Sequence, residues 1–177
     1  MTRVFTVAQL LLDDQRARAG SSQWLRSAPQ PLQHRYDAIR SLGIVDEAED
    51  SDLDRIVASM SRLFRTMGAA ITFLPEGRQW SAASTWRPRG TGALQDSFCR
   101  TTVLGSGPLV VGDAWLGRHL VPRNDIRFYA GYPLESPDGT RMGAVCVFDP
   151  SPRDEDSVEL DLLRDFAILV QSILYTD

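Results

Sequence analysis

The stretch from residue 126 to residue 148 constrains the fold more than any other part of this sequence. Two runs of strand-like residues, 126–134 and 141–148, flank the letters SPDGT at 136–140, which are typical of a hairpin turn. Both faces of each run are largely apolar. A sheet that is apolar on both faces must be covered on both. We therefore expect a hairpin that lies inside a layered fold.

Helical patterns lie on either side of this predicted hairpin. Apolar residues recur at helical spacing after acidic starts at residues 51–54 and at Asp154, and we expect the second helix to run to about Tyr175. Shorter helices are expected over 7–18 and 32–42, and further strands over 69–74, 79–86 and 109–111. Because helices near the chain ends can cover only one face well, the loop-rich segment 87–125 is expected to cover the other. Residues 1–31 are expected to form an N-terminal helix and connector, and residues 32–177 a single domain.

The composition excludes several kinds of chemistry. All 19 basic residues are arginine, so no Schiff-base or phosphate-loop lysine exists. A zinc site made only of protein ligands would need both histidines and both cysteines. The net charge of -4 owes much to acidic blocks at 46–54 and 146–177, which we assign to helix starts. The negative charge and the scattered tryptophans argue against a nucleic-acid partner.

We expect no membrane partner and a cytoplasmic location. No apolar stretch approaches the roughly 20 residues of a membrane span. The apolar run from Val4 to Leu12 is interrupted by polar residues and followed by charges, which favours an amphipathic helix over a signal peptide. Two cysteines do not form a disulfide framework in a chain of this length.

The segment expected to cover the second face of the sheet contains the residues that could bind a ligand. Residues 96–102, with the letters DSFCRTT, are rich in hydrogen-bonding groups, and Arg100, Arg118, Arg123 and Arg127 add fixed cations nearby. One interpretation is a pocket for a small polar or anionic molecule. The other is a capped short helix with internal Asp–Arg pairs and solvated arginines. The residues alone leave both open.

No catalytic arrangement is recognisable. Nothing in the context of His34 or His119 indicates a general base. Cys99 would be reactive if a helix start or Arg100 lowered the pKa of its thiol. Cys146, between apolar neighbours, is expected in the core. Their separation of 47 residues does not say whether the two thiols meet.

Several motifs in order along residues 35–175 resemble a bacterial GAF domain. They read IRSLGIVD at 39–46, LDRIV at 53–57, DSFC at 96–99, PLVV at 108–111, IRFYAG at 126–131 and CVFD at 146–149. The subgroup is the one attached to bacterial histidine kinases, phosphatases and diguanylate cyclases. The resemblance implies an α+β fold, with an antiparallel sheet of five to six strands, terminal helices packed on one face, and short helices and loops over the other.

The resemblance also implies where a ligand would lie. Pockets of such domains accept cyclic nucleotides, tetrapyrroles or other small molecules, and no cofactor is indicated for this chain. The candidate ligand-binding residues are Ser97, Phe98, Cys99, Arg100 and Thr101 on the lid, with Asp113, Arg127, Tyr129 and Cys146 on the sheet or its edge. The segment 115–125 is shorter than in related domains and lacks their Asp-x-Arg-Phe element. The cysteine pattern of GAF-fold free methionine sulfoxide reductases is not matched.

We therefore expect a stand-alone, non-enzymatic GAF protein that senses a small, anionic ligand or a redox signal. It would form a homodimer through its terminal helices and act on a separate effector protein. Two alternatives stay open. One is an interaction or dimerisation module with a vestigial pocket, and the other is a thiol-based reductase that uses Cys99.

Overall fold

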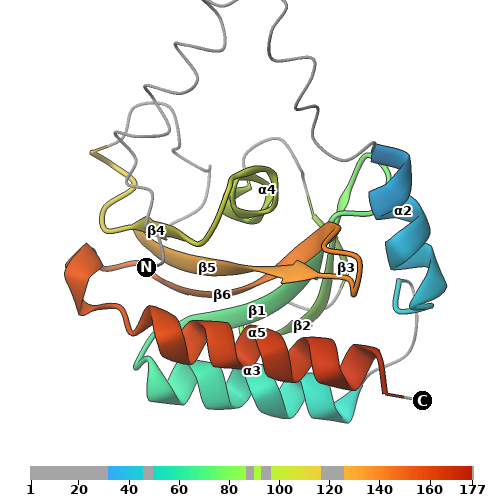
Figure 1. Cartoon of the computed structure of the whole chain (residues 1–177). Coiled ribbons are helices and arrows are strands. Elements are labelled where there is room, and N and C mark those ends of the chain that lie inside the picture. Colours follow the sequence, from blue (N-terminus) through green and yellow to red (C-terminus); the bar gives the residue numbers. More distant parts are fainter. Residues whose placement is uncertain (1–31, 46–49, 87–89, 93–96, 117–125, 177) are drawn as a thin grey trace, which may run out of the picture.

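A computed structural model describes residues 32–45, 50–86, 90–92, 97–116 and 126–176. Within these residues the centre of the fold is an antiparallel sheet with the strand order β3-β2-β1-β6-β5-β4 (Figure 1). The strands are β1 (Gly68–Phe73), β2 (Gln79–Ser84), β3 (Gly90–Gly92), β4 (Leu109–Val111), β5 (Phe128–Glu135) and β6 (Arg141–Asp149). The two central strands, β1 and β6, are distant in sequence, so the sheet forms only when the two ends of the domain meet.

Helices lie on both faces of this sheet. Two of them, α3 (Ser51–Leu63) and α5 (Leu160–Leu174), run side by side under one face, and α4 (Phe98–Leu104) lies across the other (Figure 1). The helix α2 (Leu32–Ser41) lies beside the β5–β6 hairpin, where Arg35 Nε donates to the Arg141 carbonyl at 2.8 Å. The predicted α+β fold with terminal helices on one face is confirmed. The helix expected over 7–18 lies outside the described residues.

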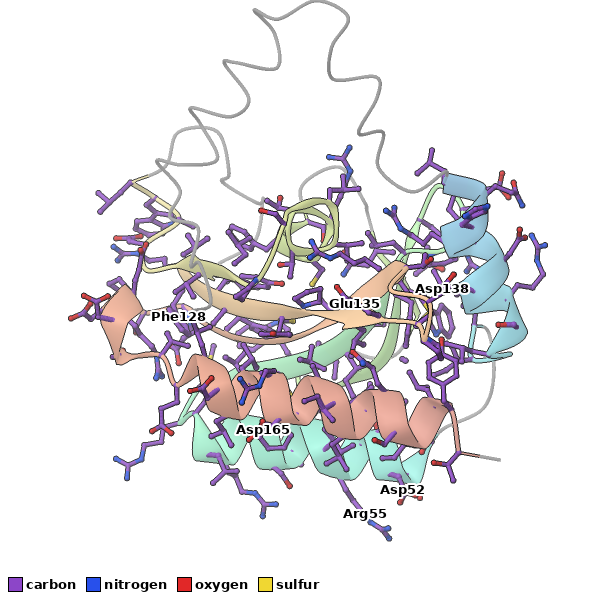
Figure 2. The ribbon with its side chains drawn as sticks, viewed as in Figure 1. Asp52, Arg55, Phe128, Glu135, Asp138 and Asp165 are labelled. Carbon is purple, nitrogen blue, oxygen red and sulfur yellow. The ribbon has the colours of Figure 1, made fainter. Side chains whose placement is uncertain are left out.

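The β5–β6 hairpin is closed by the turn chemistry that its sequence predicts. The Ser136 amide donates to the Thr140 carbonyl at 2.9 Å, and the Thr140 amide donates to Ser136 Oγ at 3.1 Å. Gly139 has φ of +83°, a conformation that favours glycine. Figure 2 shows Glu135 and Asp138 at this end of the sheet. The turn fixes a register in which Phe128 pairs with Asp149 and Glu135 with Arg141.

The first acidic block caps a helix, as expected. Asp50 precedes α3, and its carboxylate accepts hydrogen bonds from the amides of Asp52 and Leu53. On the outer side of α3, Arg55 forms an exposed ion pair with Asp52 at 3.0 Å (Figure 2). These acids therefore serve the helix itself.

The second acidic block corrects our prediction of a continuous helix from Asp154. Asp154 caps a short 3-10 turn, η2 (Glu155–Ser157), by accepting from the amide of Asp156. Val158 then has extended backbone angles, so α5 begins only at Leu160. Among the described residues, no helix combines the length and the apolar character that crossing a membrane requires.

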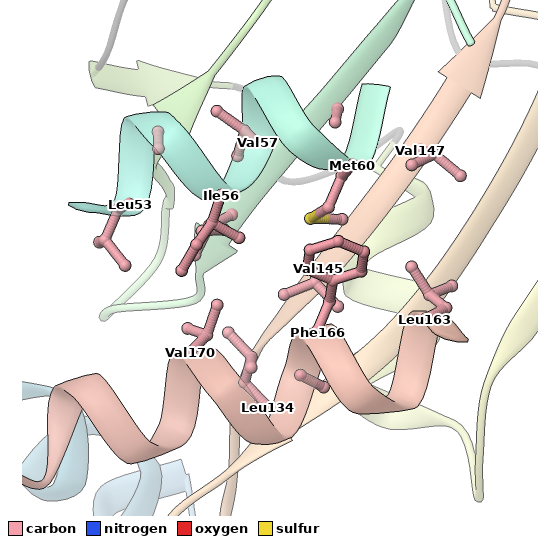
Figure 3. Packing of buried hydrophobic residues seen from close by; sticks show 14 of the residues in the cluster. Leu53, Ile56, Val57, Met60, Leu134, Val145, Val147, Leu163, Phe166 and Val170 are labelled. Carbon is pink, nitrogen blue, oxygen red and sulfur yellow. The ribbon is translucent and has the colours of Figure 1, made fainter. Parts of the chain in front are cut away.

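The larger core lies between the sheet and the pair α3 and α5. Figure 3 shows apolar side chains from both helices pointing toward the sheet and toward each other; they include Leu53, Ile56, Val57, Met60, Leu134, Val145, Val147, Leu163, Phe166 and Val170. Each such side chain stabilises the fold by about 1.5–3 kcal/mol when fully buried. Alternate residues of β6, including Cys146, point to the opposite face and form a second apolar cluster with α4. The candidate site lies in this second cluster.

Candidate functional site

The helix α4 holds the candidate residues over the sheet. Ser97 precedes it, and its side chain accepts a hydrogen bond from the Arg100 amide at 3.3 Å. The Ser97 hydroxyl also donates to the side-chain oxygen of Gln79 on β2. One face of α4 is buried, and its residues are Phe98, Cys99, Thr102 and Val103.

Tyr129 on β5 organises the buried side chains below α4. Its ring stacks on Phe98 with the ring centroids 4.9 Å apart. Its hydroxyl lies 2.9 Å from Thr102 Oγ1 and 3.6 Å from the sulfur of Cys99. Thr102 in turn donates to the carbonyl of Phe98 at 3.0 Å. Burial is the main reason that the pKa of Tyr129 is raised well above its usual value, so the hydroxyl keeps its proton.

The two thiols meet in the same cluster. The sulfurs of Cys99 and Cys146 lie 3.8 Å apart, and both residues are buried and unbridged. The hydrogen bond with Cys146 is the main reason that the pKa of Cys99 is lowered to about 7; Thr72, Tyr129 and Ser97 contribute, and burial opposes the shift. The same hydrogen bond raises the pKa of Cys146 well above its usual value. Cys99 is therefore the residue of the pair that ionises first.

Asp113 and Arg127 form a separate pair at the end of β4. Arg127 Nε donates to Asp113 Oδ1 at 3.0 Å, and its terminal nitrogen donates to the other carboxylate oxygen. The guanidinium also lies over the Trp115 ring, 4.2 Å from its centroid. The hydrogen bond from Arg127 lowers the pKa of Asp113. This arrangement holds the guanidinium against Asp113 and Trp115.

The remaining candidates lie away from the buried cluster. Arg100 is exposed on α4 and Thr101 is half-buried, whereas Thr102, which sequence reasoning left out, is fully buried and contacts Tyr129. Helical spacing would have selected Thr102, because it lies four residues after Phe98 and three after Cys99. Gln79 lacked any such signal, since its contact with Ser97 spans β2 and α4.

One cavity among the described residues lies apart from the candidate residues. A cavity of about 450 Å³ lies at the start of α5 and is lined by Tyr132, Val158, Glu159, Leu160, Asp161, Leu162 and Arg164. In the part of the chain that the structure describes, no three side chains among His, Cys, Asp and Glu converge as metal ligands. Arg118, Arg123 and His119 lie outside the described residues.

Sequence comparison finds one informative relative, while no protein-family model matches the chain. A cyclic di-GMP phosphodiesterase of Pseudomonas aeruginosa is 32% identical over 155 residues, which cover 84% of this chain. The match extends over 26% of the phosphodiesterase. This chain therefore spans about a quarter of the length of its relative.

Structure comparison finds the same architecture in proteins of different activities. The GAF domain of an Acinetobacter phosphoenolpyruvate-protein phosphotransferase matches with a TM-score of 0.61 and 16% identity, over 82% of this chain and 93% of that one. The free methionine-R-sulfoxide reductase of Neisseria meningitidis, solved with its substrate, also has a TM-score of 0.61 and 16% identity, over 83% and 92% of the two chains. At this level of identity the comparison concerns the fold.

The comparisons contradict our prediction that the protein is not an enzyme. The 32% identical relative is a phosphodiesterase, and one neighbour in fold is a reductase. The absence of lysine excluded only the kinds of catalysis that use a lysine side chain. It did not exclude a phosphodiesterase or a reductase activity. What the resemblance implied about architecture is confirmed by several solved GAF domains. The chain is a GAF-fold domain.

Proposed function

We propose that this GAF-fold domain regulates the hydrolysis of cyclic di-GMP by a phosphodiesterase. The observation that supports this most strongly is the 32% identity to a cyclic di-GMP phosphodiesterase, with a match that covers a quarter of that protein. A domain that accounts for a quarter of a phosphodiesterase and has the fold of sensory domains is suited to control the remainder.

Within this proposal α4 is the element that responds to the input. It contacts the sheet through Phe98, Cys99 and Thr102, so a change in this small buried cluster alters how the whole helix is held. A small anionic ligand would bind on the same side of the sheet. Arg100 is exposed there, whereas Arg127 is already held by Asp113.

The proposal also includes a homodimer formed through α5. Ile168 and Leu169 on this helix are 52% and 46% exposed, although the neighbouring residues Ala167 and Val170 are buried in the core. Contiguous exposed apolar surface can mark a contact surface, and these two side chains are neighbours on α5. A second copy of the domain would bury them by placing α5 against α5, and the dimer would carry a change in one domain to its partner.

The experiment replaces the aligned quarter of the Pseudomonas phosphodiesterase with this chain and measures hydrolysis of cyclic di-GMP. We expect the chimera to be active, and Tyr129→Phe in the inserted domain to change its rate about five-fold or more. That substitution removes the hydroxyl that contacts Thr102 and Cys99. Asp52→Ala, on the exposed side of α3, is the matched control and should leave the rate unchanged. Equal rates for the wild-type and Tyr129→Phe domains would refute the proposal.

A further inference from the structure

The approach of Cys99 and Cys146 is a consequence of the tertiary structure. Cys99 lies on α4 and Cys146 on β6, and their sulfurs are 3.8 Å apart. A disulfide requires about 2.05 Å, so the sulfurs need to approach by roughly 1.8 Å. The approach would involve rotation of the two side chains and a shift of the seven-residue helix α4. These are also the only cysteines in the chain, so neither has a competing intramolecular partner.

The two thiols differ in how readily they ionise, and stepwise oxidation to a disulfide requires such a difference. The Cys99 sulfur accepts a hydrogen bond from the Tyr129 hydroxyl and lies within hydrogen-bond distance of the Cys146 thiol, and the Thr72 side chain also favours the ionised form of Cys99. These donors stabilise a thiolate on Cys99 near neutral pH, while Cys146 stays protonated. The thiolate is the nucleophilic form of cysteine. One residue is therefore prepared to attack an oxidant, and the other to resolve the product.

Burial limits which oxidants can reach the pair. Cys99 is 6% exposed and Cys146 is 2% exposed, and both belong to the buried cluster that contains Phe98 and Tyr129. A molecule as large as an amino-acid sulfoxide would have to displace α4, whereas hydrogen peroxide is small and uncharged and needs only a local opening. Cys99 is the more exposed of the two and is reached first.

We propose that Cys99 and Cys146 form a reversible disulfide when hydrogen peroxide oxidises Cys99. The Cys99 thiolate attacks one peroxide oxygen, the O–O bond breaks, a sulfenic acid forms and hydroxide leaves. The Cys146 sulfur then attacks the Cys99 sulfur, its S–H proton is lost, the S–O bond breaks and a second hydroxide leaves. With the protons released by the two thiols, both hydroxides become water. The two thiols lose two electrons in total, and the peroxide gains them.

The disulfide would tie α4 covalently to β6. The Cys99 sulfur would move toward Cys146, which changes its contact with the Tyr129 hydroxyl on β5. This inference goes beyond the proposed function and does not depend on it, because the bond forms or fails to form in the domain whatever output the domain controls.

The test treats the reduced chain of 177 residues with a small excess of hydrogen peroxide and records its intact mass and its free thiols after denaturation. We expect a loss of about 2 Da and of both thiols, with dithiothreitol restoring both. The rate should rise with pH around a midpoint near 7, as Cys99 ionises. The wild-type measurement needs no substitution, so it is informative even where a variant folds poorly.

Single substitutions identify the order of events. In Cys146→Ala we expect Cys99 to stop at the sulfenic acid, trapped by dimedone, and in Cys99→Ser we expect Cys146 to react at least about tenfold more slowly. Asp52→Ala, exposed on α3 on the opposite face of the sheet, is the control and should react like wild type. Retention of both thiols, or a disulfide that joins two chains and doubles the mass, would overturn the proposal. So would a bond formed with free methionine-R-sulfoxide but not with peroxide.

Discussion

Gly131 is the residue that makes room for Tyr129. A Cβ atom at position 131 would lie 2.2 Å from the Tyr129 hydroxyl and 2.7 Å from the ring carbon that bears it. Tyr129 is fully buried, so its ring cannot move aside without displacing Phe98 or α4. Because Gly131 has no side chain, the Tyr129 hydroxyl can lie against Thr102 and Cys99.

We predict that Gly131→Ala destabilises the domain by about 1–3 kcal/mol, because the added carbon overpacks a filled core. The free energy of unfolding from urea denaturation, followed by circular dichroism, measures this effect. Gly92→Ala is the matched control, since a Cβ atom there meets no atom within 4 Å, and it should change stability by no more than about 0.5 kcal/mol. Equal stabilities of Gly131→Ala and wild type would show that Tyr129 is not confined as described.

At the scale of elements, Asp149 joins the end of β6 to the segment that follows α3. Its carboxylate accepts hydrogen bonds from the Met67 amide at 3.0 Å, the Ser151 amide at 3.0 Å and the Arg153 guanidinium at 2.8 Å. Arg153 also donates to the carbonyl of Phe64 at 3.1 Å. Burial opposes ionisation of Asp149, but these hydrogen bonds outweigh it and lower the pKa of the carboxyl.

We predict that Asp149→Asn lowers the free energy of unfolding at pH 7 by about 1–3 kcal/mol, since an amide nitrogen would replace one accepting oxygen. Because the pKa of the Asp149 carboxyl is lower in the folded state than in the unfolded state, its charge stabilises the fold at pH values above the ordinary carboxyl pKa near 4. This stabilisation is lost as the pH falls below that value. The difference between the two proteins should therefore shrink between pH 5 and pH 3 in urea titrations. Asp165→Asn, exposed on α5, is the control and should have little effect at either pH. A constant difference across this range would contradict the role given to the Asp149 charge.

At the scale of the whole molecule, the two faces of the sheet have different uses. One face holds α3 and α5 over the larger core, and the other holds α4 over the cluster with the thiols (Figure 1). The outer side of α5 exposes Ile168 and Leu169. The surface proposed for self-association and the proposed input site thus lie on opposite sides of the sheet.

We predict that the wild-type chain is a dimer at micromolar concentration and that the double substitution Ile168→Glu, Leu169→Glu makes it a monomer. Charged side chains at these positions would have to lose water in the interface without partners. Light scattering coupled to size-exclusion chromatography measures the mass. Leu116→Glu is the matched control, because Leu116 is 84% exposed and follows β4 in the chain, outside α5. A monomeric wild-type chain at these concentrations would refute this prediction.

Local patterns predicted most of the elements but not all their ends. The turn residues at 136–140 and the helical spacing after residue 51 act over a few neighbours, so the hairpin and α3 could be recognised from the sequence. The strand β3 had no such signal, because its Gly-Thr-Gly sequence forms a strand only by pairing with β2. The late start of α5 was also missed, because Asp154 caps a 3-10 turn instead of the helix.

By itself, the sequence determined the two-sided sheet and its covering helices, since these follow from periodicity and turn chemistry, and the order of its motifs carried the resemblance to GAF domains. Only the tertiary structure decided the site. It selected Thr102 over Thr101, held Arg127 on Asp113, and brought Cys99 within 3.8 Å of Cys146. Contacts between residues 47 positions apart depend on how α4 packs across β5 and β6, and packing is a property of the assembled layers that no local pattern records.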